Sequence, residues 1–559
     1  MYPALNDGNF QKKITSNFSE FKIPAKKPSF NEICFPKKYT LQIPQKFLAE
    51  YINPETPYKK ILIYHRIGSG KTCTSITIAE HFKLIRKIFV VLPAFLISNF
   101  RNELRSKCTG DNYITDTERQ ILLDNKPNHP AFKNIIVISN ERIDKYYNIY
   151  SYNKFVNGIQ NKTINLTNSL LIIDEIQNMV SENGLYYEVL YKAVKNAPKD
   201  FRLVIMSGSP IFDKANELAL TLNLLLDQEI PTGNDFYDQY LDVKKDSNGE
   251  IIYTAKNLDQ LKKSITGVVS YFRGAPDYVF PKTTIHLIKC NMSDLQLRMY
   301  MYIARIENQD IDWIKSELTN RYYSGTRTTS NFCYPDITHY YKLTDADFKL
   351  NNLPKYSCKY TKLIKHVKKA TGTIFIYSNF RKMGGLASLT RALLMNGFFD
   401  YTTDGEGPNR IALWTSKTNV EYRELIRNVF NRKSNVDGSS IKIILGSPSM
   451  KAGVSLLRLS EVHIVEPYWN QNQLQQVIGR GVRFCSHADL PEKDRNVNVY
   501  IYVSVHKLLR ESVDQRIMNI AIKKKLINKQ FEQALKEAAV DCELFANANI
   551  TADDNYVCD

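Results

Sequence analysis

ILIYHRIGSGKT, residues 61–72, is the stretch that determines the fold of the first half of this chain. Its apolar beginning predicts a buried strand, Gly68 and Gly70 predict a tight loop, and a helix-like pattern starts at Lys71. In this order, glycines let backbone N–H groups converge on phosphates, and the helix N-terminus adds partial positive charge. The stretch therefore predicts a phosphate-binding loop after a strand.

The residue types in the loop point to a nucleoside triphosphate. Lys71 would reach the β- and γ-phosphates, and Thr72 would supply a hydroxyl to Mg²⁺. The predicted nucleotide-binding residues of the loop are Gly68, Ser69, Gly70, Lys71 and Thr72. His65 stands where the strict pattern G-x-x-x-x-G-K-[ST] has a glycine.

A second apolar run, LLIIDE at residues 170–175, ends in two adjacent carboxylates. Ligands of open α/β sheets bind at the carboxyl ends of the strands, which is where Asp174 and Glu175 would lie. Asp174 would hold Mg²⁺, and Glu175 would orient or deprotonate the attacking water. The sequence thus predicts ATP or a similar triphosphate as the substrate, with Mg²⁺ as the cofactor.

Short β-rich runs alternate with amphipathic segments in two regions, which predicts two doubly wound parallel sheets. The predicted strands of the first region are KKILIYH (59–65), KIFVVLP (87–93), NIIVIS (134–139), LLIIDE (170–175) and RLVIMSGS (202–209). Those of the second are TIFIYSN (373–379), RIALWTS (410–416), KIILGSP (442–448), EVHIVEP (461–467) and VNVYIYVS (497–504).

The expected organisation is an α/β protein with an insertion between two lobes and a helical C-terminal extension. A basic, Pro-punctuated and extended arm covers residues 1–45, and the first lobe covers 46–230. The insertion covers 231–355, the second lobe 356–506, and the helical extension with its acidic tail 507–559. Tyr and Arg side chains of the insertion would suit stacking on bases: Tyr322, Tyr323, Arg327, Tyr340 and Tyr341.

Composition narrows the class of partner. The 559 residues carry 75 Lys and Arg against 57 Asp and Glu, a net charge of +18, which favours a polyanion and nucleic acid first. The nine cysteines are scattered and form no C-x-x-C pair, which argues against both a disulfide framework and a zinc ribbon. No apolar stretch approaches the roughly 20 residues that cross a bilayer, so we expect a soluble intracellular protein.

QVIGRGVR at residues 476–483 carries two further candidates. On a helix, Gln476, Arg480 and Arg483 would share one face, because they lie at i, i+4 and i+7. Two guanidinium groups on one face could clamp the γ-phosphate and stabilise the transition state, an effect worth roughly 10³–10⁵ in kcat.

Taken in order, these segments resemble the motifs of superfamily 2 helicases and translocases, and the Swi/Snf-like branch most. GSGKT resembles motif I, DEIQ (174–177) motif II, SGSP (207–210) motif III, residues 449–455 with Gly453 motif V, and QVIGRGVR motif VI. VLPAFLISNFRNEL (91–104), MSGSPIFDKANELALTLNLLL (206–226) and EPYWNQNQLQQVIGRGVR (466–483) resemble stretches typical of the Swi/Snf-like branch.

Three further segments resemble transcription helicases of large nucleocytoplasmic DNA viruses. They are IYHRIGSGKT (63–72), RFCSHADLPEKDRNVNVYIYV (483–503) and AAVDCEL (538–544). Members of that group include the poxvirus nucleoside triphosphatase I and the small subunit of the early transcription factor.

The resemblance implies two tandem RecA-like lobes that close on ATP, and roles for further residues. Gln45 would contact adenine, and Gln476 and Gly453 would belong to the nucleotide site. The hydroxyls of Ser207 and Ser209 would couple hydrolysis to lobe movement, and Gln177 replaces a histidine found in many relatives. The branch also tolerates a residue other than glycine at the position of His65.

Nucleic acid would be held mainly at its phosphates by four loops: Leu92–Ser98, Ser139–Arg142, Ser378–Lys382 and Ser447–Gly453. The implied function is a DNA translocase or helicase in viral transcription, at initiation or termination, in the viral particle and the host cytoplasm. Its implied partners are nucleic acid, DNA before RNA, and the viral RNA polymerase or transcription factors. An RNA or DNA unwinding helicase is one alternative, and a transcription factor subunit that uses ATP as a conformational switch is another.

Overall fold

The polypeptide forms two units, one built from residues 1–276 and 526–559 and the other from residues 277–525. This computed structural model describes residues 2–66, 68–125, 129–245, 251–308, 323–335, 343–450 and 454–559. Each unit is organised around its own parallel β-sheet.

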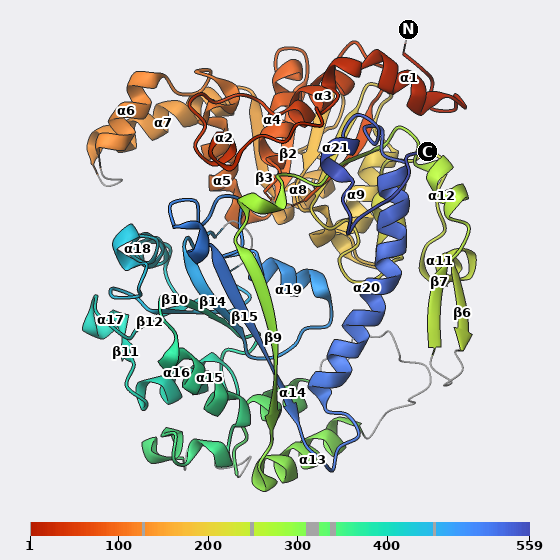
Figure 1. Cartoon of the computed structure of the whole chain (residues 1–559). Coiled ribbons are helices and arrows are strands. Elements are labelled where there is room, and N and C mark those ends of the chain that lie inside the picture. Colours follow the sequence, from red (N-terminus) through yellow and green to blue (C-terminus); the bar gives the residue numbers. More distant parts are fainter. Residues whose placement is uncertain are drawn as a thin grey trace. The chain divides into compact units, whose positions relative to one another are not determined.

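The sheet of the first unit has six parallel strands in the order β3-β2-β4-β5-β1-β8. Strands β2 and β3 of this sheet are labelled in Figure 1. Their bounds are β1 Lys60–His65, β2 Lys87–Leu92, β3 Tyr147–Ser151, β4 Ser169–Ile173, β5 Arg202–Ser207 and β8 Val269–Phe272. The central strands β4 and β5 are buried along their whole length, as expected for a sheet covered on both faces. Parallel pairing brings the carboxyl ends of β1, β4 and β5 to one edge.

Helices connect and flank these strands. They are α1 Phe10–Asn17, α2 Phe30–Cys34, α3 Ile43–Tyr51, α4 Lys71–Phe82, α5 Ile97–Leu104, α6 Asp116–Asp124, α7 Pro130–Asp144, α8 Tyr152–Gln160, α9 Leu185–Lys195, α10 Glu217–Asn223, α11 Gly233–Tyr240, α12 Leu258–Ser264 and α21 Ala546–Asn549. A separate antiparallel hairpin pairs β6 Leu241–Lys245 with β7 Ile251–Ala255.

The sheet of the second unit has seven parallel strands in the order β11-β12-β13-β10-β14-β15-β9. Their bounds are β9 Lys282–Asn291, β10 Thr373–Tyr377, β11 Phe399–Asp400, β12 Arg410–Trp414, β13 Ile443–Gly446, β14 Leu459–Ile464 and β15 Asn496–Val505. The helices are α13 Asp294–Asn308, α14 Ser324–Asn331, α15 Cys358–Lys369, α16 Leu386–Leu394, α17 Tyr401–Asp404, α18 Val420–Phe430 and α19 Gln471–Ile478. Helix α20, Val513–Glu537, begins in this unit and ends in the first.

Strand β10 shows how the second sheet separates two hydrophobic cores. Its side chains alternate, so that Ile374 and Ile376 enter one buried cluster while Phe375 and Tyr377 enter the other. Successive residues of a strand point to opposite faces, which explains the division. The predicted α/β class with two doubly wound parallel sheets is therefore confirmed.

One predicted strand is wrong. NIIVIS, residues 134–139, lies inside helix α7, and the strand of this region is β3, with the sequence YNIYS. Pro130 occupies the first turn of α7, and Ile135, Ser139 and Ile143 are buried at a helical spacing of four residues. A short apolar run fits either period, and Pro at the helix start favours the helix.

The segment predicted as an insertion contributes strands to both sheets. β8 pairs in parallel with β1 of the first sheet, and β9 pairs in parallel with β15 of the second. Alternating exposure along β9, an edge strand, explains why its sequence lacks the continuous apolar run of a buried strand.

The N-terminal arm is folded onto the first unit, which corrects the expectation of an extended arm. Phe10 and Phe18 are buried, and the Tyr58 hydroxyl donates to the Pro3 carbonyl at 3.0 Å. Phe18 packs edge-to-face on Phe47 of α3, with ring centroids 5.3 Å apart. Aromatic residues within the polar arm therefore anchor it.

Disulfides, among them Cys73–Cys108 and Cys542–Cys558, correct the expectation drawn from the cysteine spacing. Each pair joins residues from different elements, and such pairs leave no short sequence motif. Cys290, Cys333 and Cys358 are free and buried. No helix within the described ranges combines the length and apolarity needed to cross a membrane.

Candidate nucleotide site and motor motifs

The glycine loop has the local geometry that the sequence predicts. Gly68 and Gly70 adopt positive φ angles of 85° and 78°, which glycine tolerates without a steric penalty. Helix α4 starts at Lys71, directly after Gly70. A Cβ on Gly70 would lie 2.7 Å from Nε2 of Gln45, and the positive φ would strain any larger residue.

Lys71 is held inside the loop by backbone carbonyls. Its ammonium donates to the carbonyl oxygens of His65 at 2.9 Å and Arg66 at 3.4 Å. Ser69 is buried, and its hydroxyl has no hydrogen-bond partner among the described residues. A lysine and an unpartnered buried hydroxyl at a helix N-terminus are groups that a phosphate would satisfy.

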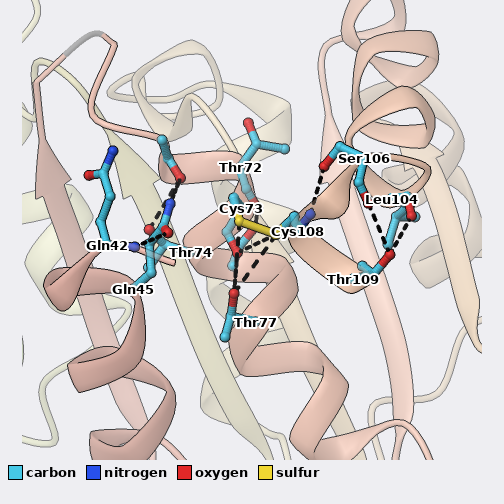
Figure 2. Close-up of a disulfide and its surroundings, with 12 residues drawn as sticks. Gln42, Gln45, Thr72, Cys73, Thr74, Thr77, Leu104, Ser106, Cys108 and Thr109 are labelled. Carbon is cyan, nitrogen blue, oxygen red and sulfur yellow. Dashed lines mark hydrogen bonds between the residues drawn. A yellow bond between two sulfur atoms is a disulfide. The ribbon is translucent and has the colours of Figure 1, made fainter. Parts of the chain in front are cut away.

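Gln45 lies beside this loop, as the resemblance implies. Its side-chain amide is buried in α3 and approaches the Gly70 carbonyl, with Nε2 at 3.4 Å. Its Oε1 accepts from the Gln42 backbone N–H at 2.8 Å. Figure 2 shows Gln45 on one side of the start of α4 and the Cys73–Cys108 disulfide on the other.

Asp174 and Glu175 follow β4 at the same edge of the sheet. Asp174 is buried, and burial together with the charge of Glu175 raises the pKa of Asp174 to about 7, while the Lys71 charge opposes this shift. The Tyr152 hydroxyl donates to the carbonyls of Asp174 at 2.7 Å and Glu175 at 3.0 Å. Glu175 has a φ of 52°, so the backbone turns sharply where the two carboxylates emerge.

A side-chain relay joins the acidic motif to the next strand. Gln177 donates from Nε2 to the Glu175 carboxylate, and its Oε1 accepts from the Ser207 hydroxyl at 2.8 Å. The Ser207 hydroxyl also accepts from the Ser209 backbone N–H at 3.0 Å. The relay connects the end of β4 with the end of β5.

The residues of this site fit Mg²⁺. Thr72 lies in the first turn of α4, and Asp174 directly follows β4. The hydroxyl of Thr72 and the carboxylate of Asp174 offer the oxygen donors that Mg²⁺ prefers. The first unit thus brings together, on adjacent elements, Gln45, Gly68, Ser69, Gly70, Lys71, Thr72, Asp174 and Glu175.

In the second unit, the predicted arginine face is wrong as a helical arrangement. Helix α19 ends at Ile478, so Arg480 and Arg483 lie in the turn that follows, while half-buried Gln476 remains on the helix. Gly479 caps the helix, and Gly481 packs so closely on Leu459 that a Cβ there would lie 2.3 Å from its side chain. The two glycines end the helix where the spacing argument assumed that it continued.

Both arginines are nevertheless held in the motif that the sequence marks. Arg480 is buried, and its carbonyl accepts from the Leu456 backbone N–H at 2.9 Å. The Arg483 guanidinium donates to the Gly479 carbonyl at 2.8 Å and to the Ser455 hydroxyl at 2.7 Å. Burial lowers the pKa of Arg483 to about 10, so it stays charged at neutral pH. Gly453 lies outside the described residues.

The four predicted nucleic-acid loops differ in outcome. Ser139–Arg142 is part of α7, where Ser139 accepts from Arg105 and Arg142 pairs with Glu118 at 2.7 Å, so the expectation of a loop is wrong. Leu92–Ser98 and Ser378–Lys382 do follow strands, β2 and β10. Ser447–Gly453 follows β13, but its last three residues lie outside the described ranges.

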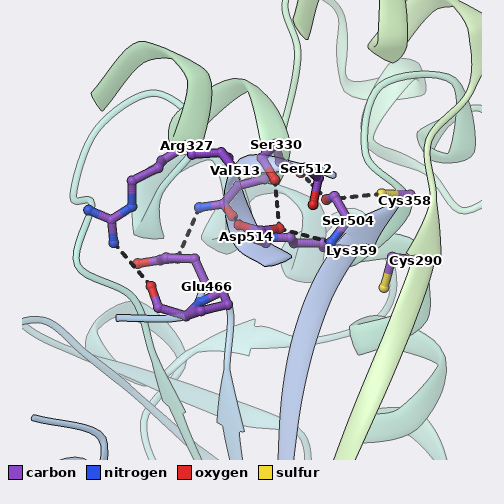
Figure 3. Close-up of polar contacts among 12 residues, drawn as sticks. Cys290, Arg327, Ser330, Cys358, Lys359, Glu466, Ser504, Ser512, Val513 and Asp514 are labelled. Carbon is purple, nitrogen blue, oxygen red and sulfur yellow. Dashed lines mark hydrogen bonds and ion pairs between the residues drawn. The ribbon is translucent and has the colours of Figure 1, made fainter. Parts of the chain in front are cut away.

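A buried polar network of the second unit was not predicted (Figure 3). Lys359 pairs with Asp514 at 2.7 Å, and both side chains are fully buried. Asn331 of α14 donates to Glu466 at 2.9 Å and accepts from Lys359 at 2.9 Å. Glu466 also accepts from the hydroxyl of Ser378, the first residue of a predicted nucleic-acid loop.

Arg327 belongs to the same region and corrects its predicted role in stacking on bases. It is buried, donates to the Pro467 carbonyl at 3.2 Å and lies over the rings of Phe380 and Trp469. Tyr323 stacks on Trp469, whereas Tyr322, Tyr340 and Tyr341 lie outside the described residues. The sequence shows charged residues next to apolar runs in this region. It does not show which of these residues pair with one another.

Known proteins are similar to this chain over most of its length. The family model described as SNF2-related domain matches residues 52–334. A "Putative ATP-dependent RNA helicase" of Acanthamoeba polyphaga mimivirus is 49% identical over 557 residues, which cover 98% of this chain and 97% of the relative. A "Termination factor NPH-I homolog" of African swine fever virus is 26% identical over 568 residues, covering 86% of this chain and 76% of the relative.

A solved structure titled "Sulfolobus solfataricus SWI2/SNF2 ATPase core in complex with dsDNA" covers 88% of this chain and 92% of its own, at 15% identity and a TM-score of 0.29. The family model spans half of the sequence, and the mimivirus relative matches nearly all of it. The chain therefore belongs to the SNF2-related family of ATP-dependent superfamily 2 helicases.

Proposed function

We propose that this protein hydrolyses ATP in order to move along duplex DNA during viral transcription. The observation that carries the proposal is the convergence of Lys71, Asp174 and Glu175 at one edge of the first sheet, in a chain of the SNF2-related family. The positive charge of Lys71 acts to lower the pKa of Asp174, so the phosphate-binding motif and the acidic motif face one another.

Each residue has a role that follows from its chemistry. Lys71 would bind the β- and γ-phosphates, and the backbone of Gly68, Ser69 and Gly70 would wrap them. Thr72 and Asp174 would hold Mg²⁺, which neutralises phosphate charge when bound. Glu175 orients or deprotonates the attacking water, and its link to Gln177 and Ser207 holds it in place. Gln45 would contact the adenine.

Arg480 and Arg483 are proposed to stabilise the negative charge that develops on the transferred phosphoryl group, and Gln476 and Gly453 are proposed to belong to the same nucleotide site. Arg483 donates hydrogen bonds to the Gly479 carbonyl and the Ser455 hydroxyl. These contacts suit a residue that fixes the turn as well as contributing charge. On this proposal Arg480→Ala lowers kcat by roughly 10³ or more while ATP still binds.

We propose DNA before RNA because the chain belongs to the SNF2-related family, and two further observations support a nucleic-acid partner in transcription. A relative at 26% identity is named a termination factor, and the net charge of +18 suits a long polyanion. We infer a place beside the viral RNA polymerase or its transcription factors, in the viral particle and the host cytoplasm. The mimivirus relative named as an RNA helicase keeps RNA unwinding as a second candidate.

The test is ATP hydrolysis by wild type, Lys71→Ala and Glu175→Gln, alone and with duplex DNA, single-stranded DNA or RNA. We expect duplex DNA to stimulate the wild type most, and both variants to lose turnover. Displacement of a triplex-forming strand would then report translocation. Near-normal hydrolysis by either variant would contradict the site.

The nucleic-acid arms separate the alternatives. Stimulation by single strands or RNA alone would indicate an unwinding helicase. Hydrolysis that no nucleic acid changes would indicate a subunit that uses ATP as a switch under the control of a protein partner.

A further inference from the structure

A buried chain of polar side chains connects the phosphate loop with the C-terminal segment. His65 Nε2 lies 2.9 Å from the Ser270 hydroxyl, and that hydroxyl donates to Oδ2 of Asp541. The other carboxylate oxygen of Asp541 accepts from the Tyr271 backbone N–H at 2.9 Å. His65, Ser270 and Asp541 are each 0% exposed. Buried polar groups of this kind are costly unless they are paired. These hydrogen bonds therefore fix the end of β1, strand β8 and the C-terminal segment relative to one another.

His65 links this chain to the lysine of the site. It is the last residue of β1, and its carbonyl oxygen accepts from the Lys71 ammonium at 2.9 Å. The ring and the carbonyl of one residue therefore contact the C-terminal segment and the phosphate-binding lysine respectively. A glycine, which the strict motif has at this position, could not make the first contact.

The second carbonyl that holds Lys71 is connected to the same segment. The Arg66 carbonyl accepts from Lys71 at 3.4 Å, and its guanidinium approaches Asp554 at 3.4 Å. Asp554 also pairs with Lys536 of α20 at 2.7 Å. Both residues whose carbonyls hold Lys71 are thus tied, through their side chains, to the last part of the chain.

The hydrogen bonds have a defined direction. At pH 8, above its pKa, Asp541 is a carboxylate and only accepts, so the Ser270 hydroxyl donates to Asp541 and its oxygen is left to accept from His65 Nε2–H. His65 Nδ1 is buried and has no hydrogen-bond partner among the described residues, as expected of an unprotonated nitrogen. Burial lowers the pKa of His65 well below its usual range, which agrees with a neutral ring of this single tautomer.

We propose that Asp541, Ser270 and His65 act as a positioning relay through which the C-terminal segment, residues 538–559, sets the phosphate loop for ATP. The inference rests on the proposed function, because it assumes that Lys71 binds the phosphates. None of the three residues touches the nucleotide. They act by holding the strand end from which the loop starts.

The test compares ATP affinity and turnover in Ser270→Ala, Lys71→Ala and a control, Gln11→Ala. Gln11 donates to the carbonyls of Ala538 and Ala539 at 3.0 and 3.1 Å, so its loss removes contacts of the same segment that lie outside the relay. Ser270→Ala removes one link of a buried chain and should weaken binding of a fluorescent ATP analogue by about tenfold, with kcat changed far less. Gln11→Ala should leave that affinity within about twofold of wild type.

A spectroscopic readout distinguishes positioning from general stabilisation. In Asp541→Asn, the amide oxygen keeps the Tyr271 N–H and the amide nitrogen donates to Ser270. The hydroxyl proton of Ser270 is then released from residue 541, and we expect it to turn to His65 Nε2, 2.9 Å away. The ring proton then moves to Nδ1. The ¹⁵N shifts of His65 in protein labelled at histidine, recorded at pH 8, should exchange their assignments, which His65→Gln identifies by loss of the signals.

Equal ATP affinities in Ser270→Ala and Gln11→Ala, or unchanged His65 shifts in Asp541→Asn, would overturn the relay. Retained ATP binding and turnover in Lys71→Ala would instead contradict the proposed site. The two failures are therefore separable, and thermal denaturation of each variant checks that it is folded.

Discussion

Gln177 occupies the centre of the contacts between the acidic motif and the serines after β5. It donates to Glu175 and accepts from Ser207, so one amide satisfies a carboxylate and a hydroxyl at once. Only a side chain with a donor and an acceptor on the same planar group can do this, which glutamine shares with a neutral histidine. The replacement of the histidine found in many relatives therefore preserves the hydrogen-bonding capacity of the position.

We predict that Gln177→Glu lowers kcat by about 10²-fold or more and changes ATP affinity little, because a carboxylate cannot donate to Glu175 and repels it. Steady-state hydrolysis with nucleotide-binding measurements checks this. Asn183→Asp is the matched control, since it makes the same amide-to-acid change at an exposed residue further along the same connection. Equal losses in the two variants would mean that added negative charge, and not the relay, is responsible.

Asp541 gives a prediction on pH. Burial raises the pKa of Asp541 to about 7, above its value in the unfolded chain, so the folded state binds the proton more tightly. Stability conferred by this proton is present at low pH and is lost as pH rises towards 7, by at most about 1.4 kcal/mol per pH unit. The titratable groups facing Asp541 stay neutral over this range, because burial lowers the pKa of His65 and raises those of Tyr51 and Tyr556.

The measurement is urea unfolding of wild type and Asp541→Asn between pH 5 and pH 7. The free energy of unfolding of the wild type should fall relative to that of the variant as pH increases. Two profiles that run parallel would show that Asp541 is ionised throughout, and would contradict the shift.

Residues whose role depends on local geometry can be predicted from the sequence. Gly68 and Gly70 adopt the positive φ angles that the motif requires, and Lys71 starts the helix, because strand, loop and helix are adjacent in the chain. Contacts between residues that are far apart in the sequence cannot be predicted in this way. Nothing near His65 in the sequence indicates that its ring meets Ser270 and, through it, Asp541.

At the scale of elements, helix α14 is an example of a segment whose composition is misleading. Its run of small polar residues and Arg327 resembles an exposed nucleic-acid contact, yet Thr326, Arg327, Ser330 and Asn331 are buried. The helix is accommodated because Asp514, Glu466 and Lys359 satisfy its polar groups. The pairing of these charges depends on the tertiary fold, which the pattern of one segment does not contain.

We predict that Lys359→Ala destabilises the second unit by about 3–5 kcal/mol, because it leaves the Asp514 carboxylate buried without its cation. Chemical denaturation followed by tryptophan fluorescence checks this, since Trp469 belongs to the same core. Lys365→Ala, at an exposed position of the same helix, is the control and should change stability by no more than about 0.5 kcal/mol. Similar losses in both would mean that the ion pair contributes nothing.

The strand of this region is YNIYS and not the predicted NIIVIS. An apolar run by itself therefore does not identify a strand. The run in α7 uses only one face for burial, whereas β3 is an edge strand whose polar residues face outward. Length and flanking Pro decide between helix and strand better than apolarity does. The central strands, buried on both faces, were all found.

For the molecule as a whole, the first unit is assembled from two distant parts of the chain. Residues 526–559 belong with residues 1–276, although the entire second unit lies between them in sequence. The Val540 backbone N–H donates to the Val269 carbonyl at 2.9 Å, and Asn549 bonds to Tyr271 and Arg273. Composition alone makes this segment an acidic tail. Its buried residues make it part of the core.

We predict that ending the chain after Val540 destabilises the first unit by more than about 4 kcal/mol, because Phe545 is lost from its packing on Phe47 and Phe272 together with the buried Asp541 and the Cys542–Cys558 disulfide. Differential scanning calorimetry should show the transition of the first unit at lower temperature and that of the second, which has its own core, unchanged.

A chain ending after Cys558 is the matched truncation, because it loses only the ion pair between Lys262 and Asp559 and the hydrogen bond from the Asp559 N–H to the Glu537 carbonyl, and keeps the disulfide and every buried residue. Surface ion pairs contribute about 1 kcal/mol or less, so its two transitions should coincide with those of the full chain. A longer truncation that lowers both transitions equally would mean that the units unfold as one. A first transition that stays in place would mean that the C-terminal segment is bound to the lobe without supporting it, and the relay through Ser270 would then lack the rigid attachment that positioning requires.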